Sequence, residues 1–331
     1  MSMTRVNPRT GETLRLAGPV DPRDGDPLVG TGWLPDLPDR RDFGVDHMLK
    51  GDGDGVSKKR DGLRNAFHKL GLASAYSDKL GLPGCCDLSN LFSRVENQGA
   101  IGSCTAQAAV GIVEYFQRRA FGKHLEGSRL FVYKTTRQLG GFEGDSGAFL
   151  RTAMAALALC GVPEEVHWPY TDDAEAFDRE PPSFVFAVAD DFQANRYFCH
   201  DPFGADIDGE KLVTSVKTAI AYGVPAMFGF YGFDSFGQAD RPGDIPLPGT
   251  DEQARWGHAV VASGYDDNYV ITNAQNGDST TGAFKIRNSW GAGWGDQGYG
   301  WIPYDYVRYG LASDFWSMLS QDWVETGNFG L

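Results

Sequence analysis

The sequence predicts an α+β protein in which a helical half is followed by a β-rich half. Apolar residues recur at helical spacing in the first half of the chain, as they do after Cys104. After Glu180-Pro181-Pro182, short apolar runs separated by turn residues are typical of strands. The chain has 331 residues, and 41% of them are hydrophobic, enough for substantial packed cores. These observations divide the chain into an N-terminal extension over residues 1–81, a helical domain over 82–182 and a β-rich domain over 183–331.

Most of the N-terminal extension is polar. Residues 1–32 are rich in Pro, Gly, Asp and Arg without an apolar period, so we expect loop or disorder with little packing. Residues 33–43 interleave large apolar side chains with prolines that enforce an extended backbone, and such a strip needs a groove. Residues 51–55 alternate Gly and Asp, but the spacing of a calcium loop fails after Asp54, so we expect a flexible turn. A short helix is predicted over 63–72.

Three helices are predicted in the helical domain, which is expected to begin near Leu82. The helix that starts at Cys104 should be central, because its apolar residues continue for several turns. Trp168-Pro169-Tyr170 is expected to close this half with an aromatic turn. The predicted helices are 104–120, 128–139 and 149–159.

The β-rich domain should form a twisted, antiparallel, barrel-like sheet. One amphipathic helix over 210–222 interrupts the strand-like runs. Asn276-Gly277 is a strong signal for a hairpin turn. The predicted strands are 184–188, 224–230, 258–265, 269–272, 284–288 and 299–303.

The formal net charge of −14 is unevenly distributed. Residues 1–81 hold 13 Lys and Arg against 12 Asp and Glu, a net +1, whereas residues 82–331 carry −15. An acidic body repels nucleic acid phosphates and anionic lipids, so we expect neither nucleic acid nor membrane as a partner. Acidity also aids solubility, which is an alternative to any role in steering a substrate.

No apolar run is long enough to span a bilayer, and the first residues lack the apolar region of a secretory signal. A cytoplasmic monomer is the default expectation, while removal of a signal or export by another route stays open. The chain has five cysteines. The adjacent pair Cys85-Cys86 and the scarcity of disulfides in reducing compartments favour free thiols.

Cys104 stands where a helix is expected to begin. Gly102 and Ser103 before it are typical of a tight loop and a helix N-cap. Exposed N–H groups and the positive end of the helix dipole lower the pKa of a thiol at this place and favour the nucleophilic thiolate. Gln98, six residues earlier, is able to direct its amide N–H groups to the same place. For an isolated cysteine, a buried structural role is the alternative.

Two distant segments favour a catalytic role for Cys104. His258 heads an apolar, strand-like run, and Asn288 ends another. A cysteine, a histidine and an asparagine supply the nucleophile, the general base and the residue that orients the base in a thiol hydrolase. His258 follows Cys104 by 154 residues and Asn288 follows His258 by 30, close to the spacing expected for this arrangement. Each residue taken alone is also compatible with a structural role.

In these segments the sequence resembles the papain-like cysteine peptidases, the family of papain and the cathepsins. Residues 98–104 match the family's oxyanion glutamine and nucleophile loop, His258 matches its base in a His-Ala-Val context, and Asn288 begins its Asn-Ser-Trp-Gly motif. The resemblance extends more loosely from about Leu82 to about Phe315. It implies the two-domain fold of the family, with a helical left domain, a β-barrel-like right domain and the active-site cleft between them.

The resemblance also implies a role for each site residue. Cys104 is the nucleophile, His258 the base, Asn288 its orienting partner and Gln98 an oxyanion donor, and no metal ion or cofactor takes part. In such ion pairs the pKa of the cysteine falls to about 3–4. The residues around Gly147 correspond to the family's substrate-binding strip, for which a simple turn is the alternative. The implied substrate-binding residues are Ser146, Gly147, Ala148, Phe149, Gly257 and Trp290, the last of which also shields the His258–Asn288 hydrogen bond.

Two positions depart from the family pattern. Ile101 replaces a cysteine that most members use in a disulfide, so that bridge is absent. Thr105 replaces the aromatic residue that usually follows the nucleophile, which alters the packing beneath the cleft. Neither departure removes a catalytic group.

The resemblance implies a cysteine endopeptidase that acts on a peptide or protein substrate and is made as a latent zymogen. Residues 1–81 are predicted to act as a prosegment that lies in the cleft, as in family zymogens, where the segment runs in reverse. Two alternatives use the same residues. One is a catalytically silent peptide-binding protein on the same scaffold, and the other is a thiol amidase or acyltransferase that acts on a non-protein amide.

Overall fold

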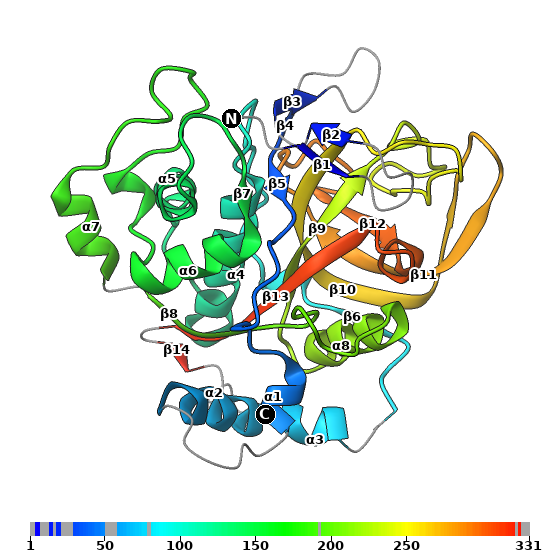
Figure 1. Ribbon diagram of the computed structural model, residues 1–331, viewed down its shortest axis with the longest axis horizontal. Helices are drawn as coiled ribbons and strands as arrows, with labels where there is room; N and C mark the ends of the chain where they lie inside the picture. The colour runs from blue at the N-terminus through cyan, green and yellow to red at the C-terminus, as the bar shows by residue number, and fades with distance from the viewer. Residues whose placement is uncertain are drawn as a thin grey trace.

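The computed structural model describes residues 4–6, 13–15, 18–20, 29–49, 58–77, 81–190, 193–321 and 324–325. The helices between residues 104 and 189 lie on one side of the molecule, and most of a large sheet lies on the other (Figure 1). The chain around residues 33 and 34 runs between the two sides (Figure 1). The α+β class and its two-sided arrangement are therefore confirmed.

The helical side is built around α4 (Cys104–Phe121), in which residues 104–117 are all buried. The next helix, α5 (Arg129–Gly140), begins after Ser128, whose hydroxyl accepts a hydrogen bond from the Phe131 N–H and caps the helix. The third helix, α6 (Leu150–Leu159), starts one residue later than predicted, because Phe149 belongs to the short strand β7 (Ala148–Phe149). Single turns of 3₁₀-helix occur at Ser89–Leu91 and Glu165–His167.

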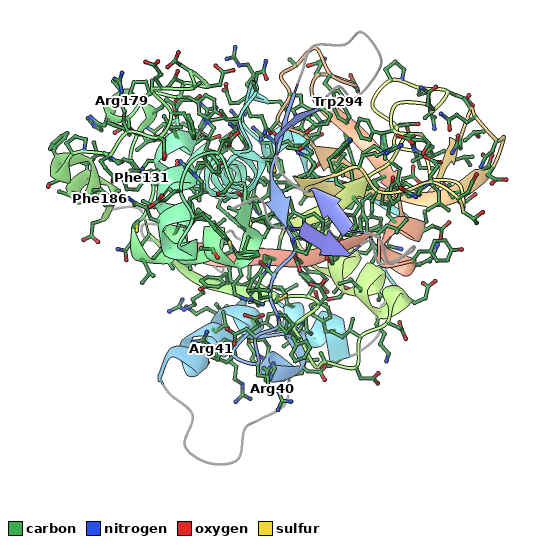
Figure 2. The ribbon with its side chains drawn as sticks, turned by 45° about the horizontal axis from the view of Figure 1, so that its top comes forward. Arg40, Arg41, Phe131, Arg179, Phe186 and Trp294 are labelled. Carbon is green, nitrogen blue, oxygen red and sulfur yellow. The ribbon has the colours of Figure 1, made fainter. Side chains whose placement is uncertain are left out.

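The prediction of a strand over 184–188 is wrong, because these residues form helix α7 (Ser183–Ala189). Val185 and Ala189, four residues apart, share a helix face and are buried with Phe131 in a small separate cluster. The rings of Phe131 and Phe186 meet edge to face, 5.0 Å apart (Figure 2). A short run of aromatic and β-branched residues fits either state, so periodicity alone did not decide between them.

The other side of the molecule is an eight-stranded sheet with the order β12-β11-β10-β9-β13-β14, in which β6 also pairs with β10 and β8 with β13. All of these pairs are antiparallel. The long strand β10 runs through both predicted strands, 258–265 and 269–272, and the Asn276-Gly277 turn joins it to β11. The strands are β6 (Cys85–Asp87), β8 (Ala194–Cys199), β9 (Ala226–Gly232), β10 (Trp256–Thr272), β11 (Ser279–Arg287), β12 (Tyr299–Pro303), β13 (Ala312–Gln321) and β14 (Val324–Glu325).

Two helices accompany the sheet. The predicted amphipathic helix is α8 (Gly209–Ala221), and the side chain of Asp208 caps it by accepting a hydrogen bond from the Lys211 N–H. A short helix, α9 (Tyr304–Arg308), follows β12. None of the helices in the described part of the chain is long and apolar enough to cross a membrane.

The N-terminal extension reaches both ends of the cleft between the two sides. Near one end lie two small hairpins, formed by β1 (Thr4–Val6) with β2 (Thr13–Arg15) and by β3 (Gly18–Val20) with β4 (Val29–Thr31), and β5 (Trp33–Leu34) follows them (Figure 1). At the other end lie α1 (Val45–Leu49), α2 (Lys58–Lys69) and α3 (Leu72–Ser77). The predicted helix over 63–72 is thus longer at its start and is broken at Gly71, which has a φ of +72°. Residues 51–55 lie outside the described residues.

Aromatic side chains join α2 and α3 to the body. Phe67 is fully buried, stacks on Tyr76 with 5.4 Å between ring centroids and meets Phe198 of β8 edge to face at 5.6 Å. The Tyr76 hydroxyl donates a hydrogen bond of 2.6 Å to the carbonyl of Ser215 in α8. These helices therefore share the core of the sheet side.

Candidate active site

The candidate nucleophile, Cys104, is the first residue of α4, as predicted, and is fully buried. Its Sγ accepts a hydrogen bond from the Ala259 N–H of β10, with 3.4 Å between nitrogen and sulfur. The preceding loop is fixed by Asp145, whose Oδ1 accepts a 2.8 Å hydrogen bond from the Gly102 N–H. A helix of one side and a strand of the other thus meet at this sulfur.

His258 precedes Ala259 in β10, so its backbone lies next to the N–H that binds the Cys104 sulfur. Its Nε2 is 2.7 Å from Oδ1 of Asn288. An amide oxygen only accepts, so Nε2 carries the proton and Nδ1 keeps a lone pair. Nδ1 has no hydrogen-bond partner among the described residues. The Trp290 ring stacks on the imidazole at 4.5 Å between centroids, so it covers one face of His258.

Gln98, the predicted oxyanion donor, is held at both ends of its amide. Its Oε1 accepts a hydrogen bond from the Ser289 hydroxyl, and its Nε2 donates to the Ile101 carbonyl at 2.9 Å. A Cβ built on Gly30 would lie only 2.9 Å from the same Nε2, so the backbone of the N-terminal extension fills the space beside this donor.

Residues 29–43, which we call the strap, lie along the cleft. The Gly30 N–H donates to the Gly99 carbonyl at 2.7 Å, and the Trp290 indole N–H donates to the Gly30 carbonyl at 3.1 Å. The backbone N–H of Gly32 forms a hydrogen bond with the sulfur of Cys104. The expectation that little packs before residue 33 is therefore wrong for residues 30–32, which are buried because the nucleophile loop supplies their partners. Of the strip over 33–43 that was expected to need a groove, residues 33–35 are buried, whereas Leu37, Pro38, Arg40 and Arg41 are exposed.

The predicted substrate-binding strip contacts the strap. β5 pairs with β7 in parallel, with Trp33 opposite Ala148 and Leu34 opposite Phe149. The Ala148 N–H donates to the Gly32 carbonyl at 2.8 Å, and a Cβ built on Gly147 would lie 2.2 Å from the same oxygen. Ser146 and Gly257, which were also predicted to bind substrate, make other contacts. The Ser146 hydroxyl donates to the carbonyl of Gly147, and Gly257 lies opposite Tyr231 in the sheet.

The charge state of the site differs from the expected thiolate in this closed form. Burial raises the pKa of the Cys104 thiol to about 12, against the opposing effect of the Ala259 and Gly32 N–H groups. Burial also lowers the pKa of His258 to about 4, against the opposing effect of its hydrogen bond to Asn288. Both shifts favour uncharged groups, because the strap removes the water that would stabilise an ion pair.

Sequence patterns did not reveal three residues that complete the site. The Tyr170 hydroxyl donates to the Gln98 carbonyl at 2.8 Å and lies 2.6 Å from the Ser103 hydroxyl, so it braces the nucleophile loop. Asp145 binds the same loop through Gly102. Asp314, in β13, accepts a hydrogen bond from the indole of Trp33. The aromatic turn expected at residues 168–170 contains Tyr170, and the substrate-binding strip expected around Gly147 contains Asp145, but neither pattern indicated that these residues hold the nucleophile loop.

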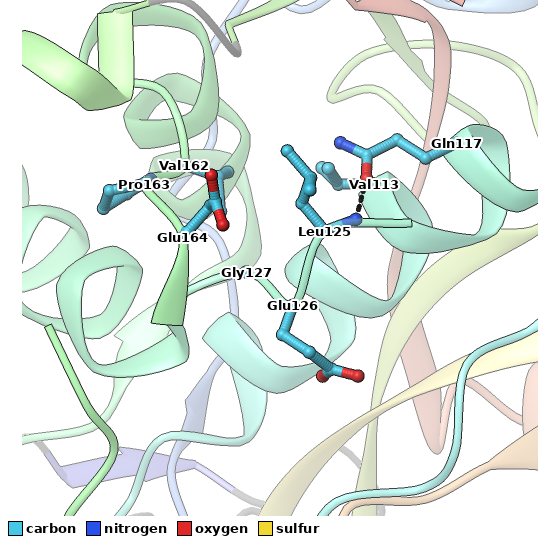
Figure 3. Close-up of a pocket in the computed structure, with 8 residues that line it drawn as sticks. All are labelled: Val113, Gln117, Leu125, Glu126, Gly127, Val162, Pro163 and Glu164. Atoms are coloured by element: carbon cyan, nitrogen blue, oxygen red, sulfur yellow. Dashed lines mark hydrogen bonds between the residues drawn. The ribbon is translucent and has the colours of Figure 1, made fainter. Parts of the chain in front are cut away.

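A small cavity lies beside α4 (Figure 3). Its volume is about 10 Å³, and the Leu125 N–H donates to Gln117 Oε1 at its edge. Nearby, Glu114, His124 and Glu126 place one potential metal ligand each within 4.8 Å of one another. The Glu114 carboxylate already accepts hydrogen bonds from the Ser93 hydroxyl and the Gly127 N–H, so it has a structural role. All five cysteines are free thiols in the structure.

Comparisons with known proteins agree with this geometry. The family described as papain family cysteine protease matches residues 83–318. The uncharacterized peptidase C1-like protein L477 of Acanthamoeba polyphaga mimivirus is 35% identical over 225 residues, which are 66% of this chain and 68% of that relative. Papain of Carica papaya is 25% identical over 62% of this chain and 50% of the relative.

The fold comparison extends further along the chain. Xylellain, a cysteine protease from Xylella fastidiosa, has a TM-score of 0.64 at 29% identity, covering 88% of this chain and 96% of that one. The digestive procathepsin L 3 of Tenebrio molitor larval midgut shares the fold, with a TM-score of 0.52 at 21% identity over 72% of this chain and 71% of that one. Since the family match covers most of the chain and includes every residue of the site described above apart from the strap, the chain belongs to the papain family of cysteine proteases.

Proposed function

We propose that this protein is a cysteine endopeptidase that hydrolyses peptide bonds through an acyl-enzyme and that the strap keeps it latent. The observation that carries the proposal is the connected set at the sulfur. Cys104 Sγ is bound by the N–H next to His258, and His258 Nε2 is fixed by Asn288, which leaves Nδ1 as the nitrogen with an open lone pair. This is the order of groups that nucleophilic acyl transfer needs.

The chemistry follows from these positions once a peptide replaces the strap. The Sγ proton moves to Nδ1 of His258, and the sulfur attacks the carbonyl carbon of the scissile bond. The oxyanion that forms accepts hydrogen bonds from the Cys104 N–H and from Gln98 Nε2, which turns away from Ile101. His258 then protonates the leaving amine, and water, activated by the same imidazole, releases the acyl group from the sulfur.

Latency follows from how the strap meets the same groups. The group of the strap that meets the sulfur is the Gly32 N–H. This N–H donates a hydrogen bond, and it is not an electrophile that the sulfur could attack. It also fills the space beside Gln98 Nε2 and pairs with β7. A substrate must therefore displace residues 30–34, whose side chains and backbone are buried. We therefore assign the inhibitory role to this part of the extension and not to the whole of residues 1–81.

The proposal is tested with the full-length chain before and after limited proteolysis between residues 46 and 82. Hydrolysis of a peptide library and labelling of Cys104 by an epoxide probe should both rise after the cut, and Cys104→Ala should abolish both without a shift in thermal unfolding. Equal rates before and after the cut, with the strap released, would remove the inhibitory role. Labelling without hydrolysis of any peptide would favour the silent binding protein or an enzyme for non-protein amides.

A further inference from the structure

Asp145 connects two segments of the cleft that lie far apart in the sequence. Its Oδ1 accepts a 2.8 Å hydrogen bond from the Gly102 N–H of the nucleophile loop and a 2.6 Å hydrogen bond from the Tyr133 hydroxyl. The Tyr133 oxygen in turn accepts the Gly147 N–H of the predicted substrate-binding strip at 3.1 Å. An unbroken chain of hydrogen bonds therefore runs from the strip through Tyr133 and Asp145 to the nucleophile loop. We call this chain the Asp145 link.

The nucleophile loop is shaped to receive this link. A Cβ built on Gly102 would lie 3.2 Å from Asp145 Oδ1 and 3.3 Å from the Tyr133 hydroxyl oxygen. Gly102 is buried, so a side chain there would crowd both groups. The lack of a side chain is therefore what lets the backbone N–H of the loop approach the carboxylate closely.

Helix α5 anchors the other end of the link. Tyr133 and Arg137 both belong to this helix, and Tyr133 is fully buried. The Arg137 guanidinium donates a hydrogen bond to the Gly144 carbonyl and pairs with Asp178 at 2.8 Å. The other carboxylate oxygen of Asp178 accepts the Gly144 N–H at 3.2 Å. The strip is thus held by a core helix, and Asp145 carries that fixed position over to the nucleophile loop.

The strap also joins the two segments, but it does so in the closed form only. The Gly30 N–H donates to the Gly99 carbonyl of the nucleophile loop, and the Gly32 carbonyl accepts the Ala148 N–H of the strip. Both contacts end when the strap leaves, whereas the Asp145 link consists of body residues and remains. No disulfide takes over this task, because all five cysteines of the chain are free thiols.

We propose that Asp145 is a positioning residue that keeps the Cys104 sulfur aligned with a peptide held by the strip. This inference rests on the proposed peptidase function. The strip would hold the backbone of the substrate, while the attacking sulfur lies two residues after Gly102. Attack on a carbonyl carbon needs a fixed separation between the two, and a displacement of about 1 Å costs about 10²-fold in rate. Hydrogen bonds to a charged acceptor are stronger than those to a neutral one, so the carboxylate resists such a displacement.

Electrostatic activation of the sulfur is not the role of Asp145. Burial is the main cause that raises the pKa of the Cys104 thiol, and the negative charge of Asp145 raises this pKa further. The carboxylate therefore disfavours the thiolate that attacks. Its contribution to the reaction must come from the two donors that it holds in place.

The test compares steady-state peptide hydrolysis by cut full-length wild type with that of its variants. Asp145→Ala should lower kcat by about 10- to 100-fold with little change in KM, because the peptide still binds but meets a displaced sulfur. Asp145→Asn keeps an oxygen that accepts both donors, so it should recover most of kcat. Asp172→Ala is the matched control and should change kcat much less, since Asp172 holds the same loop through the Ala100 N–H at 3.1 Å from outside the strip.

Alkylation of Cys104 by iodoacetamide, followed by mass spectrometry, separates lost alignment from a general defect. This reagent reacts with the thiolate without binding to the strip. Its rate with cut Asp145→Ala should therefore equal or exceed that of wild type, because the opposing charge is gone. A parallel fall in alkylation and kcat, or an unchanged kcat, overturns this inference alone. Absence of peptide hydrolysis by cut wild type removes the proposed function and this inference with it.

Tyr133→Phe tests the same link if Asp145→Ala fails to fold. It removes the hydroxyl between Asp145 and Gly147 and keeps the ring. We expect kcat to fall at nearly constant KM, by less than in Asp145→Ala, because the hydrogen bond to Gly102 remains. In the double variant the second change should add little, since both residues act through one link. An unchanged kcat in Tyr133→Phe, or losses that add in full, would contradict the link.

Discussion

At the scale of single residues, Gln98 is the group whose role depends most on the strap. Ser289 fixes its Oε1, while its Nε2 donates to the Ile101 carbonyl in the closed form. The amide is thus anchored through its oxygen and needs only a small movement at its nitrogen to reach an oxyanion. A preorganised donor of this kind costs little to align at the moment of reaction.

Gln98→Ala should therefore lower kcat of the cut enzyme by about 10²–10³, with a smaller effect on KM, because the donor suits the tetrahedral oxygen better than the ground-state carbonyl. Ser289→Ala is the matched control. It removes the anchor and keeps the donor, so its loss of kcat should be much smaller. Steady-state kinetics under conditions in which acylation limits the rate measure both. An unchanged kcat in Gln98→Ala would assign this residue a structural role.

The sequence reveals site residues that form a local motif and misses those that depend on distant packing. Cys104 and Gln98 share one loop, and His258 and Asn288 each stand at a strand end within a characteristic short motif, so their spacing was informative. Asp314 becomes part of the site through a bulge that Asp201 holds and through a strap residue 281 positions away. No local pattern encodes such a meeting, because it depends on how β9 and β13 align.

At the scale of elements, the N-terminal extension has two parts with different roles. The strap lies against the nucleophile loop, whereas α2 and α3 complete the core beside β8 and α8. The polar composition of residues 1–32 concealed the first part, because glycine backbone and not apolar side chains makes its contacts with the cleft. Sequence-based inference identified the strip after Trp33 because prolines and large apolar residues mark it.

Gly32→Ala should release the strap from the cleft. A Cβ at this position would lie 2.1 Å from the Gly102 carbonyl oxygen. Because Asp145 holds the Gly102 backbone through a hydrogen bond, the nucleophile loop is not able to move away from the new Cβ without losing that bond. We expect the uncut variant to label with the epoxide probe at least about tenfold faster than wild type, which corresponds to about 1.4 kcal/mol of lost docking free energy. Gly81→Ala is the control, because a Cβ there meets nothing within 4 Å. Wild-type labelling of Gly32→Ala would show that the strap does not block the nucleophile.

Phe67→Ala should act on stability and not on latency. Truncation of a fully buried phenylalanine costs about 3–5 kcal/mol, and the cavity would open among α2, Tyr76 and Phe198. Thermal and denaturant unfolding should both shift strongly, while labelling of Cys104 in the folded, uncut chain stays slow. Phe121→Ala is the control, because that ring is 56% exposed and its loss should cost little. Rapid labelling of folded Phe67→Ala would mean that α2 belongs to the inhibitory part.

At the scale of the whole molecule, docking of the strap is coupled to pH in two opposing directions. Burial raises the pKa of Asp36 in the strap from 3.8 to about 7, and burial also raises that of Asp314 well above its ordinary value. Both carboxyls therefore take up protons when the strap docks. Burial lowers the pKa of His258 from 6.5 to about 4, so the imidazole releases a proton in the same step.

The sign of each contribution follows from these shifts. The stabilisation of the closed form by protonation of Asp36 is fully present below about pH 4 and is lost as the pH rises toward 7. The contribution of neutral His258 is present above pH 6.5 and is lost as the pH falls toward 4. Two carboxyls oppose one imidazole, so we expect the strap to bind more tightly at pH 5 than at pH 8.

The measurement is the labelling rate of the cut chain divided by that of the uncut chain at each pH, since this ratio cancels the ionisation of the thiol in the released form, in which the probe reacts. It should fall from pH 5 to pH 8 in wild type. In Asp36→Asn, which keeps the side-chain shape and removes the titration, the fall should be shallower, because Asp314, whose pKa burial raises well above its ordinary value in the closed form, is then the only carboxyl left to oppose His258. Asp39→Asn is the control within the strap, because Asp39 pairs with the neighbouring Arg41 on the surface and its loss should leave the wild-type slope. A wild-type slope in Asp36→Asn would locate the pH dependence elsewhere, and a ratio that rises with pH in wild type would show that the imidazole outweighs both carboxyls.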